Sequence, residues 1–370
     1  MRLTGGRRHR AEDTAPRPQT RRPEEEEEEE LLEVQLEVSS ARPRPWLPTR
    51  QDFISRRAML SSFVRSAFRT KPGVCQTAVR AMSASTSSAS ASAAGPFTSL
   101  AVSRPADAIV HVQLNRPEKR NAMNRAFWSE MVTCFNQIAE DSACRVVVVS
   151  GAGKIFTAGI DLMDMASDVL QPEGDDTARN AWNMRKIITK YQETFSVIEK
   201  CPKPVVVGVH SACVGGGVDL ITACDIRLCT QDAWFQVKEV DIGLAADVGT
   251  LQRLPKVIGS RSLVNELALT ARKLYADEAK SCGLVSRVFA DKEAMMAAAL
   301  EMAGEIASRS PVAVQGTKIN LIYSRDHSVA EGLDYMATWN MSMLQTQDVM
   351  KSAQASMEKK SLKTVPYSKL

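Results

Sequence analysis

Three consecutive glycines followed closely by an acid form the most chemically suggestive stretch of this sequence. The stretch reads Cys213-Val-Gly-Gly-Gly-Val-Asp219, and two further acids, Glu239 and Asp247, lie in apolar surroundings downstream. Glycine lets the backbone approach a ligand closely and direct its N–H groups at an oxygen atom. Carboxylates beside that oxygen can move protons. The combination predicts proton transfer next to an activated carbonyl group.

Two short segments that follow apolar runs could supply amides for such a carbonyl oxygen. Gly159 permits a sharp turn that would aim the next amide, that of Ile160, inward. Gly216 precedes an expected helix over 218–222, and an amide at a helix N-terminus carries partial positive charge. The alternative is that these glycines only let a helix pack closely against a strand. The predicted carbonyl-binding residues are Ala158, Gly159, Ile160, Asp161, Leu162 and Gly216.

The apolar pattern predicts the elements that must position these residues. Residues 109–114 alternate as a strand does, and a helical period follows over about 124–140. Residues 145–150 and 204–210 are apolar runs typical of strands buried on both faces. The polar stretch from about 164 to 200 predicts a loop and a long helix. Strands that alternate with helices predict an α/β core.

Bulk composition bounds the class of protein. A chain of 370 residues that is 44% hydrophobic can hold one large core or two modest ones. The net charge of +4 comes mostly from the N-terminal quarter, so it is weak support for a nucleic-acid partner. The eight cysteines form no CxxC pair and no His stands at ligand spacing, which predicts buried free thiols and no metal site. No run of about 18 apolar residues occurs, so no membrane-spanning helix is expected.

The first hundred residues change composition sharply. Residues 1–58 contain seven successive glutamates and are expected to be disordered, whereas 59–96 are rich in Arg and Ser and contain no acid. The second composition is that of a mitochondrial transit peptide followed by a linker. Because glutamates ahead of it would oppose import, we expect Met59 to be the functional start. A disordered cytosolic tail is the alternative.

The last three residues match a second targeting signal. Ser368-Lys369-Leu370 matches the signal that the peroxisomal import receptor reads. The mitochondrial matrix and the peroxisome are therefore both expected locations, and the import receptor is an expected partner.

The ordered motifs of residues 109–370 resemble the enoyl-CoA hydratase/isomerase, or crotonase, family. The matching pieces are 115–117, 156–161, 203–205, the glycine triplet with Asp219, 222–227, 243–252 and 279–285. The resemblance implies an α/β spiral of ββα units over 97–310 and a C-terminal helical region over 311–370 that completes a trimer, with a hexamer built from two trimers. It also implies an acyl-CoA thioester whose carbonyl is held by the amides of Ile160 and Gly216, with no metal and no cofactor beyond the coenzyme A of the substrate.

The three acids distinguish reactions within this family. By resemblance, hydratases carry Glu where Asp219 stands, a second Glu at the position of Glu239, and glycine where Asp247 stands. The pattern here implies isomerisation of a 3,5-dienoyl-CoA to a 2,4-dienoyl-CoA in fatty-acid β-oxidation, in which a proton leaves C2 and another joins C6. Those carbons are too far apart for one side chain, so two carboxylates divide the work. By resemblance Asp247 is the base at C2, Glu239 is the donor at C6 with a raised pKa, and Asp219 tunes the pair.

Each acid also has a structural alternative. Asp219 could be an acid favoured by a helix dipole, Glu239 could pair with Lys238 or Arg227, and Asp247 could cap a segment that begins at Val248. Three further acids are expected to serve turns or buried pairs, namely Asp161, Asp225 and Asp241.

Other features concern binding and rival functions. Coenzyme A carries phosphates, and its expected basic contacts are Arg116, Lys119 and Arg120. Ser211 departs from the family, whose members often have glycine there, and could reposition the loop that leads to Gly216.

A 2-enoyl-CoA hydratase and a Δ3-Δ2-enoyl-CoA isomerase are the alternatives within the family. A relative that binds RNA through a basic face is a more remote alternative, because the core lacks a helix rich in Lys and Arg.

Overall fold

The fold is built on two sheets, which the computed structural model describes within residues 97–164 and 174–370. The larger sheet has the order β1-β2-β3-β4-β6-β9, and only its first pair, β1 with β2, is antiparallel. Its strands are β1 (Leu100–Ala106), β2 (Ile109–Leu114), β3 (Val146–Gly151), β4 (Val205–Val209), β6 (Ile226–Thr230) and β9 (Arg287–Phe289). The smaller sheet, β5-β7-β8, contains β5 (Ala212–Val214), β7 (Trp234–Gln236) and β8 (Leu274–Tyr275).

Helices connect the strands and complete the C-terminal part. The α-helices are α3 (Arg125–Glu140), α5 (Thr177–Lys200), α6 (Gly216–Ala223), α7 (Thr250–Val257), α8 (Arg261–Thr270), α9 (Ala276–Ser281), α10 (Lys292–Ala307), α11 (Pro311–Arg325), α12 (Val329–Met343) and α13 (Gln347–Met357). Three short 3₁₀ turns are η1 (Pro117–Lys119), η2 (Glu239–Ile242) and η3 (Leu362–Thr364). The strands and long helices predicted from the apolar pattern are all present, with bounds that differ by one or two residues.

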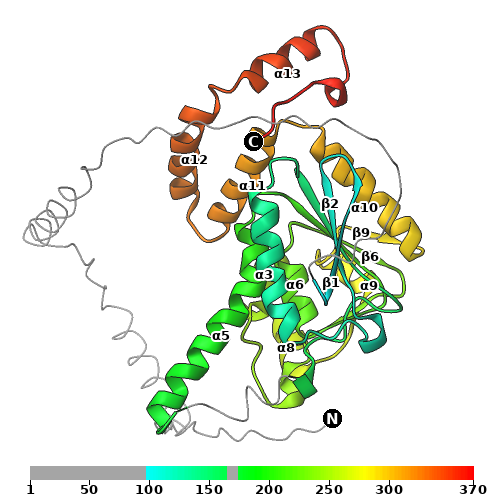
Figure 1. Ribbon diagram of the computed structural model, residues 1–370, viewed down its shortest axis with the longest axis vertical. Coiled ribbons are helices and arrows are strands. Elements are labelled where there is room, and N and C mark those ends of the chain that lie inside the picture. Colours follow the sequence, from blue (N-terminus) through cyan, green and yellow to red (C-terminus); the bar gives the residue numbers. More distant parts are fainter. Residues whose placement is uncertain (1–96, 165–173) are drawn as a thin grey trace, which may run out of the picture. The chain divides into compact units, whose positions relative to one another are not determined.

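The larger sheet is buried on both faces, as the continuous valine runs predict. Successive side chains of a strand point to opposite faces, and β3 illustrates this. Val147 and Val149 belong to the core cluster shared with α3, α5 and α6. Val146 and Val148 pack with Met295 of α10 on the other side. Figure 1 shows α10 on one side of the sheet and α3, α5 and α6 on the other.

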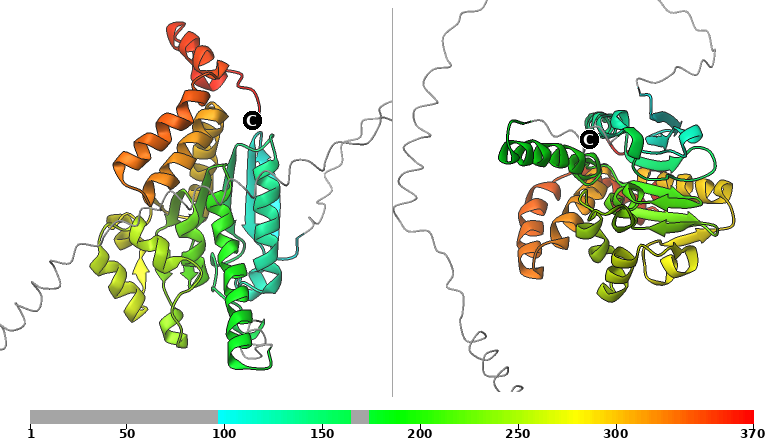
Figure 2. Two further views of the ribbon diagram at one scale, coloured as in Figure 1. Left: turned by 90° about the vertical axis from the view of Figure 1, so that its left-hand side faces the viewer. Right: turned by 90° about the horizontal axis from the view of Figure 1, so that it is seen from below.

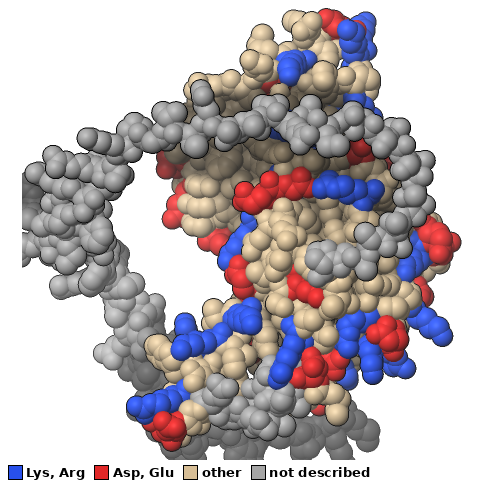
Figure 3. Space-filling view, viewed as in Figure 1, with Lys and Arg blue, Asp and Glu red and all other residues tan. Residues whose placement is uncertain are grey.

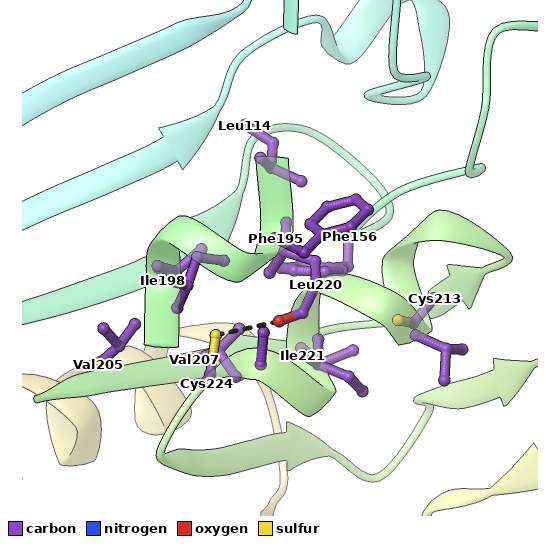
Figure 4. Packing of buried hydrophobic residues seen from close by; sticks show 14 of the residues in the cluster. Leu114, Phe156, Phe195, Ile198, Val205, Val207, Cys213, Leu220, Ile221 and Cys224 are labelled. Carbon is purple, nitrogen blue, oxygen red and sulfur yellow. Dashed lines mark hydrogen bonds between the residues drawn. The ribbon is translucent and has the colours of Figure 1, made fainter. Parts of the chain in front are cut away.

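Helix α6 lies inside the core. All eight of its residues are buried, and Leu220 shares a cluster with Phe195 of α5 (Figure 4). The Sγ atom of Cys224, directly after the helix, donates to the carbonyl oxygen of Leu220 at 3.4 Å. Because α6 is packed on every side, its first residue, Gly216, and the acid at Asp219 have a fixed position.

Two helical parts extend away from the sheets. The N-terminal end of α5 projects beyond α3, and α12 and α13 stand apart from the strands (Figures 1 and 2). In residues 97–164 and 174–370, no helix combines the length and the apolar character that crossing a membrane requires. The expectations for residues 1–58 and 59–96, including the start at Met59, fall outside the described residues.

The cysteines fit the sequence prediction where they can be seen. Seven of the eight lie in the described part of the chain and all seven are free. Six of them are buried and Cys282 is half-buried. Burial raises the pKa of the Cys134 thiol to about 12, and a thiol that stays protonated is a poor nucleophile. These side chains therefore act as small core residues.

Candidate active site

The two predicted amide-bearing segments lie side by side. Gly159 (φ +87°) contacts the backbone of β5 so closely that a β-carbon there would lie 2.7 Å from the Val214 carbonyl oxygen and 3.7 Å from the Gly215 Cα. Glycine is required at position 159 both for this backbone angle and for the contact. The residues that follow each glycine, Ile160 and Gly216, are thereby brought together.

Both amides are available to a ligand. Gly216 is the first residue of α6, where an N–H has no partner within the helix. The neighbouring amides are engaged, because Gly159 donates to the Thr157 hydroxyl at 3.1 Å and Asp161 donates to the Met123 carbonyl at 3.0 Å. Neither Ile160 nor Gly216 donates its amide to another residue of the described chain. Two adjacent free amides, one of them at a helix N-terminus, are suited to an oxyanion.

Glu239 lies directly beside these amides. A β-carbon on Gly215 would lie 3.3 Å from Glu239 Oε1, so the carboxylate contacts the backbone next to Gly216. The side chain comes from the first turn of η2 and is half-buried. Its Oε2 atom is buried and has no hydrogen-bond partner among the described residues. Burial, with a smaller contribution from the charge of Asp247, raises the pKa of Glu239.

Asp219 is the deepest of the three acids. It is fully buried, and its Oδ1 accepts a hydrogen bond of 2.5 Å from the amide of Thr250, the first residue of α7. Its Oδ2 atom has no partner among the residues that the structure describes. Burial and the neighbouring charge of Glu239 raise the pKa of Asp219 to about 7. Asp219 therefore interacts with Glu239 and is closed off from solvent.

Asp247 is the exposed acid of the three. It belongs to the loop between η2 and α7, whose backbone is bonded to α5 through Gln192. Burial of part of its carboxylate raises its pKa. The charges of Asp219 and Asp247 each interact with that of Glu239. Glu239 therefore interacts with both of the other predicted acids.

The structural alternatives for two of the acids do not hold. Lys238 pairs with Asp241 at 2.6 Å instead of with Glu239, and Arg227 donates to backbone carbonyls. Helix α7 starts at Thr250 after Gly249, so Asp247 is not its N-cap. The alternative for Asp219 is partly right, because this acid does lie in the first turn of α6. That position and its interaction with Glu239 are compatible.

The other acids that were expected to be structural do form ion pairs. Asp161 accepts from Arg116 Nη1 at 3.0 Å, and Asp225 pairs with the buried Lys318 at 2.9 Å. Arg116 also donates to the Ala122 carbonyl, so its guanidinium group links residue 122 to Asp161. Of the basic residues proposed for coenzyme A, Lys119 and Arg120 are exposed.

One residue that sequence reasoning missed organises the loop before Ile160. Asn121 is buried with φ +53°, and its side-chain amide donates to three carbonyls, those of Ala152, Ile155 and Phe156, at 2.8 to 3.1 Å. Its own carbonyl accepts from the Thr157 hydroxyl at 2.7 Å. That hydroxyl in turn accepts the Gly159 amide. An Asn in a polar turn was the available signal, since Asn tolerates this conformation, but its partners lie over 30 residues away.

Ser211 adopts a backbone conformation that suits glycine, which members of the resembled family often have at this position. Its φ is +52°, in the left-handed region, where a β-carbon costs energy. Its carbonyl still accepts from Trp234 at 3.0 Å, and β5 starts at the next residue. The departure from glycine therefore leaves the strand that leads to Gly216 in place.

Comparison with known proteins defines the class. Residues 104–364 match a family model described as enoyl-CoA hydratase/isomerase, and the chain belongs to this family. An enoyl-CoA hydratase from Bacillus anthracis has the same fold, with a TM-score of 0.65 and 29% identity over 73% of this chain and 99% of its own. A putative enoyl-CoA hydratase from Streptomyces coelicolor gives a TM-score of 0.66 at 25% identity, covering 74% of this chain and 96% of its own. The predicted crotonase fold is confirmed.

Particular relatives are much more similar. A rat protein named "Delta(3,5)-Delta(2,4)-dienoyl-CoA isomerase, mitochondrial" is 71% identical over 274 residues, which cover 74% of this chain and 84% of the relative. The human protein of that name shows the same identity and coverage. An Arabidopsis thaliana protein with that name, but designated peroxisomal, is 44% identical over 253 residues, 68% of this chain and 91% of the relative.

Proposed function

We propose that this protein is an isomerase that converts 3,5-dienoyl-CoA to 2,4-dienoyl-CoA. The observation that carries the proposal is the contact of Glu239 with the backbone next to the Gly216 amide, together with its charge interactions with Asp219 and Asp247. The relatives named for this reaction, at 71% identity in rat and human, support it. A hydratase would need two acids around one water, and the third acid has no task in that reaction.

In the proposed scheme the thioester oxygen accepts hydrogen bonds from the amides of Ile160 and Gly216. The Asp247 carboxylate removes a proton from C2, and the electron pair of that C–H bond passes into a dienolate. Protonated Glu239 then donates its proton to C6, which leaves double bonds at positions 2 and 4. One proton is removed and one is added, with no redox step. The scheme uses no cofactor beyond the coenzyme A of the substrate.

The direction of the pKa shifts supports this division of labour. Burial raises the pKa of Glu239, which favours the protonated form that a donor needs. The pKa of Asp247 is also raised, and a base is more effective when its pKa lies nearer the operating pH. Asp247 is exposed, so it can release its proton to solvent after each turnover. Asp219 is fully buried and its charge interacts with that of Glu239, so it acts through Glu239.

The test compares substrates on one enzyme preparation. We expect the full-length protein to convert 3,5-dienoyl-CoA, followed by the absorbance of the conjugated 2,4-dienoyl thioester, and to hydrate 2-enoyl-CoA much more slowly. A preference for 2-enoyl-CoA would favour the hydratase, and a preference for a 3-enoyl-CoA would favour the monoene isomerase. On the face shown in Figure 3, Lys and Arg are interspersed with Asp and Glu, which gives the RNA-binding alternative no support there.

Partners and locations follow from the same proposal. Exposed Lys119 and Arg120 would bind the phosphates of coenzyme A. Large apolar side chains on α12 and α13 are exposed, among them Val329 (81%) and Met357 (82%), which supports burial against other copies in a trimer and a hexamer. Relatives designated mitochondrial and peroxisomal support both organelles. The exposed residues Ser368 to Leu370 would meet the peroxisomal receptor.

A further inference from the structure

One face of α5 holds the loop that carries Asp247. Gln192, Ser196 and Glu199 follow one another at the spacing of neighbouring residues on a helix face. The Nε2 atom of Gln192 donates to the Asp247 carbonyl at 2.8 Å. Ser196 and Glu199 bind the guanidinium group of Arg253 in α7, at 3.1 Å and 2.9 Å. We call these three residues the α5 seat.

The two ends of the loop are held differently. Arg253 is buried and packs against Gly249, where it leaves no room for a β-carbon, so the α7 end is fixed by several contacts. Asp247 itself is exposed. Within residues 97–164 and 174–370, the Gln192 amide is the only side chain of another residue that forms a hydrogen bond with Asp247. The neighbouring side chains of Ala246 and Val248 are buried in the core, and Gln192 adds the hydrogen bond that holds the Asp247 carbonyl between them.

We propose that Gln192 is a positioning residue for Asp247: by holding the carbonyl of this residue it sets the distance between the carboxylate and C2 of the substrate. The inference rests on the proposed function, in which Asp247 is the base. Gln192 has no contact with the carbonyl-binding amides and no charge. Since its hydrogen bond is to Asp247, we expect its effect on the proton-removal step, which is sensitive to small displacements of the reacting groups.

The test uses three variants of the full-length protein with 3,5-dienoyl-CoA. Gln192→Leu removes the donor, and we expect kcat to fall by about tenfold or more with KM almost unchanged. Gln192→His, assayed at pH 8 where a free imidazole is mostly neutral, keeps an N–H donor at this position and should restore part of the loss. Glu193→Gln is the matched control, because Glu193 is the next residue of α5 and, within the described part of the chain, its carboxylate pairs with Lys200 alone. A kcat for Gln192→Leu equal to that of the control would overturn the inference.

A double-mutant cycle separates positioning from a general structural role. If Gln192 acts only through Asp247, Gln192→Leu should cause no further loss in an Asp247→Asn background. The same fractional loss in both backgrounds would contradict the inference. Hydrogen exchange of the amides in 244–250 gives a readout that is independent of turnover, and it should accelerate in Gln192→Leu alone. Unchanged exchange in Gln192→Leu would contradict the positioning role of Gln192, whichever reaction the protein catalyses. Faster exchange in Gln192→Leu, together with a wild type that does not isomerise 3,5-dienoyl-CoA, would contradict only the proposed function.

Discussion

The Glu239 carboxylate lies against the Cα of Gly215, and a β-carbon at position 215 would stand 3.3 Å from Oε1. This contact joins the proposed proton donor to the residue that directly precedes the Gly216 amide. The backbone of Gly215 (φ +52°, ψ −118°) is itself accessible only to glycine at low cost. Proton donor and carbonyl-binding amide are therefore positioned by one glycine.

Gly215→Ala should damage both functions of this glycine. We expect the free energy of unfolding to fall by about 1–3 kcal/mol from backbone strain, and kcat to fall because the methyl group displaces Glu239 and the Gly216 amide. Urea unfolding and steady-state kinetics measure the two effects. Gly283→Ala is the matched control, since Gly283 has φ +83° and open space around its Cα. It should lose stability and keep kcat; equal loss of kcat in both variants would show that the contact with Glu239 is unimportant.

Asn121→Ala tests the support of the carbonyl-binding loop. The variant removes the two N–H donors that three carbonyls share and the acceptor of the Arg116 amide. At about 1 kcal/mol for each of these three groups, we expect a loss near 3 kcal/mol in urea unfolding and a lower kcat. Asn121→Gly is the control for backbone conformation, because the φ of +53° suits glycine. Similar losses in both variants would assign the effect to the side chain. Recovery in Asn121→Gly would assign it to the backbone angle and contradict our account.

Ser211→Gly should stabilise the protein slightly. The left-handed φ of +52° penalises serine, while glycine increases the entropy of the unfolded chain, so we expect a net gain of about 0.5–1 kcal/mol. Chemical denaturation at constant protein concentration measures the difference. An unchanged kcat should accompany it, because the strand after Ser211 is already in place. A loss of stability would mean that the hydroxyl has a partner in the assembled protein.

Asp219→Asn should change how stability depends on pH. Asp219 keeps its proton up to a pKa of about 7 in the folded protein but only up to its ordinary 3.8 in the unfolded chain. Between these values the folded state binds more protons, so wild-type stability falls as pH rises through this window. The advantage of the variant over wild type should therefore grow from pH 4 to pH 8, by up to about 4 kcal/mol. A difference that is constant with pH would show that Asp219 is ionised in the folded protein.

Much of the fold could be predicted because local sequence determines it. The alternation over 109–114 and the valine runs predict β2, β3 and β4 correctly. Asn124, where the predicted helical period begins, is the N-cap of α3, which starts one residue later. Helix α6 begins at Gly216, ahead of the predicted 218–222, because glycine has a low helix propensity and conceals the first turn.

The site was predicted less completely than the fold. The types of the residues and their spacing in the sequence were sufficient to identify the three acids and two amides as candidates. They could not predict three sets of hydrogen bonds: from the Thr250 amide to Asp219, from the Gln192 side chain to the Asp247 carbonyl, and from Asn121 to its carbonyl partners. In these bonds the two residues lie 31 to 55 positions apart in the sequence. Hydrogen bonds from side chains to a distant backbone leave no local pattern in a sequence. They depend on how the packed helices bring the loops together.

In the proposed mechanism Asp247 takes the C2 proton, while Glu239 and the amides of Ile160 and Gly216 serve the other steps. The most direct measurement is the turnover of 3,5-dienoyl-CoA by Asp247→Asn, with wild type and the control Asp241→Asn prepared in parallel. We predict that kcat falls by about 10²- to 10⁴-fold with binding of the substrate retained, and that Asp241→Asn remains close to wild type. Near-normal turnover by Asp247→Asn would contradict the account.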